Sequence, residues 1–217
     1  MILPTNWNEV TLQQYIKVVE VSSIDMDELD KQIRIISILS GIDEDKLLNI
    51  SLPSLKEAIR AIQFIYNLPK PKGVKTTITI GLNKFEINTN IKSLTSGEYI
   101  DLAELTKDKG SVTSNLPNIL AIFFKPINWF GFPIKKYYKK NVDGNLIQTL
   151  ESRARTINIL RDNLMMGEVI SLSSFFLSNW NCLMEATLHY SEQQNKKMAE
   201  QLNKAIDKDL RNFGDGI

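Results

Sequence analysis

The sequence IFFKPINWFGFPIKKYYKK, residues 122–140, is the stretch on which the expected fold depends. It holds seven aromatic residues and five lysines in nineteen positions, and two prolines and one glycine interrupt it. Proline removes a backbone donor and fixes φ, so this stretch is not expected to form a long helix. An irregular segment of this composition has three interpretations: it stacks on nucleic acid, it docks on a protein partner, or it folds onto its own core.

Upstream of this stretch, the sequence pattern predicts helices. Thr11 and Gln14 have the spacing of a capping box that opens a helix. The acidic run DMDELD, residues 25–30, falls in the first turns of a second helix, where negative charge complements the helix dipole. Gly41 is the expected C-cap of that helix. In all, the expected helices cover about residues 11–21, 25–40, 44–48, 53–68, 95–105, 117–124 and 145–165.

The period of the sequence changes after LPKPKG, residues 68–73, which is the expected linker. Residues 75–80 and 84–88 alternate apolar and polar side chains and predict two strands joined by a turn at residues 81–83. A lone hairpin is only marginally stable in water. This hairpin is therefore expected to pack on helices or to pair with another chain. Residues 106–115 are expected to form a loop.

The C-terminal part of the chain, residues 168–212, contains no proline and no glycine. This pattern predicts one very long helix or two helices with a soft joint, which would span on the order of 60 Å. Part of it is then expected to pack on another subunit, with a solvated tail after Gln193 as the alternative. The expected fold is mainly α: a helical bundle with one inserted β-hairpin and a long C-terminal helix, divided into segments 1–68, 69–140 and 141–217.

Most chemistry is not expected from this composition. His189 is the only histidine and Cys182 the only cysteine, so the zinc ligand sets built from these residues cannot form. No nucleophile elbow, phosphate-binding loop or dinucleotide-binding motif occurs. We therefore expect no enzyme activity, no metal and no cofactor. The longest apolar runs are too short to cross a membrane, and the N-terminus lacks the pattern of a signal peptide.

Charge is spread unevenly along the chain although the net charge is only +1. Residues 69–140 carry 12 basic and 5 acidic side chains, whereas residues 1–68 carry 6 basic and 10 acidic ones. A basic middle segment indicates an acidic partner surface or a polyanion near it, or a solvated lysine-rich loop.

Several short motifs, in this order along the chain, resemble those of small proteins from tailed bacteriophages, including crAss-like phages of Bacteroides-type hosts. They are W-x-x-V-T-L-x-Q-Y (7–15), I-x-I-L-S-G-I (36–42), F-I-Y-N-L-P (64–69), L-T-S-G-E-Y-I-D (94–101) and L-P-x-I-L-A-I-F-F-x-P (116–126). The resemblance covers roughly residues 5–190. It implies a protein made in the host cytoplasm that becomes part of the virion, at the neck or tail.

The resemblance implies either of two roles. One is a ring or collar subunit that forms a homo-oligomer around the portal axis and contacts portal or tail proteins, with packaged DNA as a further neighbour. The other is a tail assembly chaperone that is absent from the finished particle. From the residues alone, a single-stranded nucleic-acid-binding protein is a third interpretation. Trp129 and Phe132 are the expected anchors. The full set of expected partner-binding residues is Phe124, Trp129, Phe130, Phe132, Tyr137 and Tyr138, and Lys135, Lys136, Lys139 and Lys140 are expected to contact an acidic partner or a polyanion.

Overall fold

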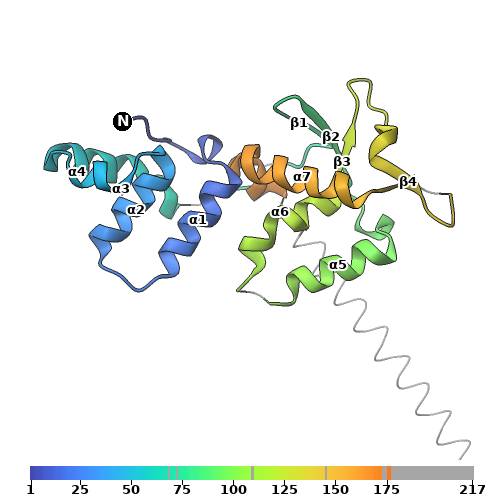
Figure 1. The fold of residues 1–217 in the computed structure, drawn as a ribbon, viewed down its shortest axis with the longest axis horizontal. Coiled ribbons are helices and arrows are strands. Elements are labelled where there is room, and N and C mark those ends of the chain that lie inside the picture. The colour runs from blue at the N-terminus through green and yellow to red at the C-terminus, as the bar shows by residue number, and fades with distance from the viewer. Residues whose placement is uncertain (68, 72, 109, 145, 173–174, 177–217) are drawn as a thin grey trace, which may run out of the picture. The chain divides into compact units, whose positions relative to one another are not determined.

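The computed structural model describes residues 1–67, 69–71, 73–108, 110–144, 146–172 and 175–176 (Figure 1). Residues Met1–Phe175 form one compact unit. The described part is mainly helical with a small antiparallel sheet region, as the sequence predicts. Residues 166–172 are helical. The expected long helix beyond residue 176 lies outside the described residues.

The N-terminal region consists of short helices whose ends are set by side-chain caps. Thr11 and Gln14 form the expected capping box, and Gly41 ends the second helix with a φ of 71°. Asp27 caps the start of this second helix and Ser51 caps the start of the helix that begins at Leu52, because their side-chain oxygens accept hydrogen bonds from backbone N–H groups. The elements are η1 (Trp7–Glu9), α1 (Leu12–Ser23), α2 (Glu28–Ser40), α3 (Glu44–Leu48), α4 (Leu52–Ala61) and η2 (Ile62–Tyr66).

Trp7 organises the packing of this region. Its side chain is 5% exposed, and its ring meets Tyr15 and Phe64 edge to face, at centroid distances of 5.7 and 5.5 Å. Its indole N–H donates to the carbonyl oxygen of Asn67 at 2.9 Å. A buried tryptophan thus has its one polar atom satisfied and links η1, α1 and η2.

The expected hairpin is present, and its partner is a strand of the same chain. β1 (Thr77–Ile80) pairs with β2 (Asn83–Ile87), and β2 pairs with β3 (Phe124–Ile127), so the sheet has the order β1-β2-β3 and is antiparallel throughout. In the β2–β3 register, Ile87 lies opposite Phe124 and Lys84 opposite Ile127. The first residues of the aromatic stretch therefore stabilise the hairpin.

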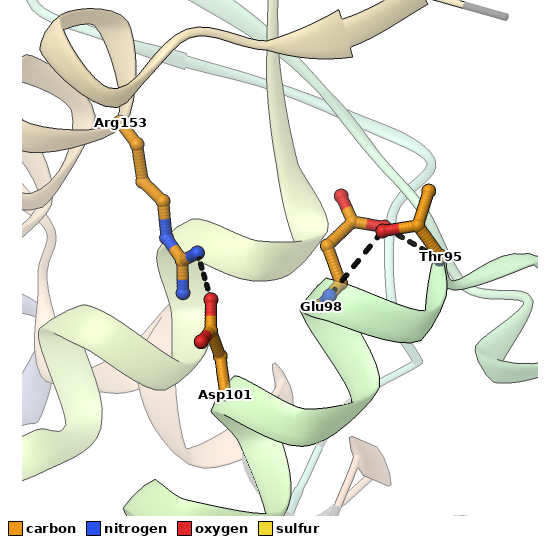
Figure 2. A network of polar contacts seen from close by, with 4 residues as sticks. All are labelled: Thr95, Glu98, Asp101 and Arg153. Atoms are coloured by element: carbon orange, nitrogen blue, oxygen red, sulfur yellow. Dashed lines mark hydrogen bonds and ion pairs between the residues drawn. The ribbon is translucent and has the colours of Figure 1, made fainter. Parts of the chain in front are cut away.

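Three further helices are α5 (Ser96–Lys107), α6 (Val112–Phe123) and α7 (Leu150–Asn163), with η3 (Ile91–Ser93) leading into α5. The α6 helix contacts β3 and the α7 helix contacts β1. Both α5 and α7 contact α6. The capping box of Thr95 and Glu98 opens α5, and the ion pair of Arg153 with Asp101 joins α7 to α5 (Figure 2). The α6 helix is the most apolar of the three and supplies the buried residues Leu116, Ile119, Leu120, Ala121, Ile122 and Phe123.

The end of α7 joins the N-terminal helices to this helical layer. The N–H of Leu12 donates to the carbonyl oxygen of Leu164, and the N–H of Met166 donates to that of Val10, both at 2.8 Å. A Cβ at Gly167 would lie 2.0 Å from the side-chain oxygen of the exposed Asn8, so a larger residue there would require the Asn8 side chain to move. Segments some 150 residues apart in the sequence are thus held side by side.

Three expected boundaries are wrong. The α4 helix ends at Ala61, and η2 follows where a continuous helix is predicted. The α6 helix begins at Val112 instead of Pro117 and ends at Phe123, because the chain leaves it to pair with β2. Residues 146–148 form β5 (Leu146–Gln148) instead of helix; β5 pairs with β4 (Tyr138–Lys140) in a second hairpin, and Thr149 caps α7.

Candidate protein-interaction site

The chain reverses sharply after β3, and a single asparagine holds the reversal. The side-chain oxygen of Asn128 accepts hydrogen bonds from the N–H groups of Phe130 and Phe132, both at 3.0 Å. The backbone N–H of Asn128 donates to the oxygen of Phe132 at 2.8 Å, and its carbonyl accepts from Gly131 at 3.0 Å. Gly131 has a φ of 87°, which favours glycine. We call residues Asn128–Phe132 the aromatic turn.

The aromatic turn presents large apolar side chains to solvent. Trp129 is 66% exposed, Phe130 86% and Phe132 67%. Leu82, at the β1–β2 turn, is 90% exposed and lies at the same end of the sheet, because Lys84 of β2 pairs with Ile127 of β3. The Lys84 ammonium donates to the Trp129 carbonyl oxygen at 3.2 Å. An ordered backbone therefore carries a contiguous group of exposed apolar residues, which is typical of interaction sites.

The four lysines of the expected site follow the aromatic turn on η4 (Lys135–Tyr137) and β4. Lys135, Lys136, Lys139 and Lys140 are all exposed. Among the described residues, none of the four forms an ion pair. The Lys136 ammonium lies 5.0 Å from the centre of the Tyr137 ring. Their charges are therefore available to an acidic partner.

The two tyrosines of the stretch have partners within the chain. The Tyr138 hydroxyl donates to the Pro126 carbonyl oxygen at 3.0 Å and so ties β4 to β3. Burial raises the pKa of the Tyr138 phenol well above its usual range, and the nearby Glu86 carboxylate adds to this shift. The guanidinium of Arg155 lies 5.2 Å from the centre of the Tyr137 ring and donates to the Tyr137 hydroxyl. Both tyrosines thus hold the second hairpin in place.

Phe124 does not belong to the exposed group. Its side chain is 0% exposed, and its ring meets Phe85 edge to face at a centroid distance of 5.8 Å. The expectation that Phe124 binds a partner is wrong, because strand pairing with β2 places this residue in the core. Trp129, Phe130 and Phe132 are exposed on the aromatic turn and the four lysines are exposed on the segment that follows it, whereas Phe124 lies in the core.

A small cavity next to the aromatic turn was not expected from the sequence. It has a volume of about 230 Å³ and lies between the sheet and α7, with Leu82, Trp129 and Arg155 among its lining residues. Ser152 and Thr156, both buried, line it as well, and the Gln148 amide donates to both hydroxyls at 3.0 Å. The i, i+4 spacing of the two hydroxyl residues on α7 is the sequence signal that could have indicated a polar patch on its inner face.

The described residues hold no cluster of three or more histidine, cysteine, aspartate or glutamate side chains arranged to bind a metal ion. His189 and Cys182 lie outside the described part. No described helix is long and apolar enough to cross a membrane. The described arrangement presents apolar side chains and positive charges to solvent. Comparison with models of protein families, with curated proteins and with solved structures found no match to this chain.

Proposed function

We propose that this protein is a structural subunit of a bacteriophage particle, a ring or collar component of the neck or tail that joins portal and tail proteins by protein–protein contacts. The observation that carries the proposal is the aromatic turn, in which hydrogen bonds to one asparagine hold three aromatic side chains in solvent. The placement in a phage particle is supported by the ordered motifs within residues 5–190, and the docking role by the turn.

The exposed aromatic residues favour a docking role on energetic grounds. Full burial of one large apolar side chain is worth roughly 1.5–3 kcal/mol, so a partner that covers Trp129, Phe130 and Phe132 gains several such contributions. The turn is already ordered in the free chain by its internal hydrogen bonds. Little conformational entropy is then lost on binding, which increases the affinity obtained from a given contact area. Tryptophan is also among the residues that concentrate binding energy in interfaces.

Mass spectrometry of purified virus particles tests this proposal directly. We expect peptides of this chain in particles purified from the host cells that carry its gene, in a constant ratio to a portal or tail protein. Peptides that occur in the lysate together with a tail protein, but are absent from finished particles, would contradict the structural role and favour the tail assembly chaperone. A phage that carries Trp129→Ala should yield fewer complete particles, while an exchange at the exposed Ile100 of α5 serves as a matched control.

A nucleic-acid-binding role is favoured by one observation, the four exposed lysines that follow three exposed aromatic residues in the sequence. Binding of this kind falls steeply with salt because counterions are released from the phosphates. Filter binding of single-stranded DNA at two salt concentrations measures this. If the substitutions K135E, K136E, K139E and K140E abolish DNA binding but leave particle assembly intact, the lysines serve the nucleic acid. If they impair assembly and no DNA binding is found, the lysines serve a protein partner.

A further inference from the structure

A second exposed surface, at the turn between α1 and α2, has the opposite charge to the aromatic turn. We call residues Ile24–Asp30 the acidic corner. Its four carboxylates, Asp25, Asp27, Glu28 and Asp30, are exposed, and within the described part of the chain none of them forms an ion pair. Ile24 is 46% exposed and Leu29 47%, so apolar side chains stand among the charges.

The two surfaces match in composition. The acidic corner places four carboxylates in six residues, 25–30, and the basic segment after the aromatic turn places four lysines in six residues, 135–140. Each surface carries four charges of one sign, and among the described residues none of these charges forms an ion pair. Each also exposes large apolar side chains, aromatic on one surface and aliphatic on the other. Surfaces of this kind attract each other by charge and bury apolar area on contact.

We infer that the aromatic turn of one copy of this chain docks on the acidic corner of a second copy. The inference rests on the proposed function, and it names the neighbour that the aromatic turn contacts. Trp129, Phe130 and Phe132 lie against Ile24 and Leu29, and the lysines face the carboxylates. The apolar contacts form the centre of the interface and the charges its rim, which is the usual anatomy of a specific interface.

The contact is head to tail where the turn and the corner of one copy bind two different neighbours, which is possible because the two surfaces belong to different elements. The aromatic turn follows β3, and the acidic corner joins α1 to α2. A copy bound through its turn still has a free corner, and its neighbour still has a free turn. Repetition of such a contact builds a ring where the rotation closes and a filament where it does not. The inference thus gives a physical basis for assembly of this chain into a ring.

Two variants of the full chain test the contact, each of which removes one surface. Trp129→Ala removes the largest apolar side chain from the contact surface of the aromatic turn. The double variant D25K and D30K reverses charge at the corner and keeps Asp27, whose side chain caps α2 by accepting from the Leu29 N–H at 2.8 Å. Native mass spectrometry and sedimentation over about a hundredfold range of concentration measure the oligomers, since mass action makes assembly depend on concentration. Circular dichroism confirms that each variant is folded.

The mixture of the two variants decides the geometry. The wild-type chain should form oligomers that dissociate at high salt, and each variant alone should lose them. Mixed in equal amounts, the two variants retain one intact turn and one intact corner between them, so they should form a one-to-one pair and nothing larger. A mass tag on one variant distinguishes this mixed pair from a pair of identical chains.

Three results would overturn the inference. A corner variant that assembles like the wild type would mean that the turn binds elsewhere, for instance to another turn. A mixture that stays monomeric would mean that the two surfaces do not meet. A wild-type chain that is monomeric at every concentration, yet is present in purified particles, would mean that the turn docks on another virion protein, so the inference fails while the proposed function stands. Head-to-tail oligomers of a chain absent from particles would give the reverse outcome.

Discussion

The aromatic stretch, residues 122–140, has a first half, residues 122–127, and a second half that begins at residue 128. The two halves have similar composition but differ in the burial of their aromatic side chains. Ile122, Phe123 and Phe124 are at most 2% exposed, whereas Trp129, Phe130 and Phe132 are at least 66% exposed, only a few residues farther along the chain. Each half contains aromatic residues, a proline and at least one neighbouring lysine. The amount of apolar side chain therefore does not decide which half is buried.

Backbone hydrogen bonding separates the two halves. The first half ends α6 and then pairs with β2 as β3, so its side chains are set against the sheet and the helices. In the second half, backbone N–H groups donate hydrogen bonds to Asn128, and these bonds hold the reversal of the chain. A turn has no face that packs on a core, and its side chains project outward. The hydrogen-bonding pattern of the backbone thus decides whether aromatic residues of this stretch lie in the core or at the surface.

The largest effect is expected from Phe124→Ala. Removal of a fully buried aromatic side chain leaves a cavity and costs about 3–5 kcal/mol of the free energy of unfolding. The matched control is Phe130→Ala, which removes the same atoms from a residue that is 86% exposed and should change stability by no more than about 0.5 kcal/mol. Urea unfolding followed by circular dichroism measures both. Equal losses in the two variants would contradict the division into a buried and an exposed half.

The division itself was only partly predictable from the sequence. The capping box at Thr11 and the glycine at residue 41 mark helix ends correctly because they act through local hydrogen bonds and local backbone conformation. The period-2 pattern likewise identified the hairpin. These signals depend on residues close together in the chain, so the helix ends and the hairpin can be predicted from the sequence.

Contacts between distant residues could not be read in this way. Phe124 pairs with Ile87 through a register that no local signal specifies, and its burial follows from that pairing. The strand at residues 146–148 was missed for a similar reason, since Leu146 and Ile147 fit a helix as well as a strand until β4 lies beside them. Exposure of Trp129 depends on the turn that Asn128 closes, and the composition of the stretch leaves open whether this residue meets a partner or folds onto the core.

The next largest change in the free energy of unfolding is expected at Asn128, the first residue of the second half. Asn128→Ala removes the acceptor of two backbone N–H groups and should cost about 1 kcal/mol, because each bond lies at the surface and water replaces it in part. Amide hydrogen exchange at Phe130 and Phe132 should accelerate, which reports on the turn itself. Asn128→Asp keeps an oxygen acceptor at the same position and should retain most of the protection. Unchanged exchange in the alanine variant would mean that other contacts hold the turn.

A smaller effect should appear at high pH through Tyr138. Its phenol is partly buried and has a raised pKa in the folded chain, whereas the unfolded chain ionises near the ordinary tyrosine pKa of 10.0. The folded state therefore binds more protons than the unfolded state above this pH, and stability is full below it and falls as the pH rises further. Solvent screening limits the size of the loss, because the side chain is only partly buried.

Thermal unfolding as a function of pH measures this contribution. The midpoint temperature of the wild type should fall above pH 10, and that of Tyr138→Phe should fall less steeply from a lower starting value, since the hydrogen bond to Pro126 is gone. Parallel curves for the two proteins would show that Tyr138 ionises equally in the folded and unfolded states. Such curves would also argue against the buried position of Tyr138 in which its hydroxyl ties the second hairpin to β3.

The smallest effect on stability, and the most informative about the exposed half, is expected from Trp129→Ala. Because 66% of this side chain is already in water, its loss should change the free energy of unfolding by no more than about 0.5 kcal/mol. The fluorescence that acrylamide quenches most readily should disappear with Trp129, whereas Trp7→Phe should leave it in place, since Trp7 is 5% exposed. A large loss of stability in Trp129→Ala would mean that the turn supports the core, and the aromatic residues beyond Asn128 would then need no partner to explain them.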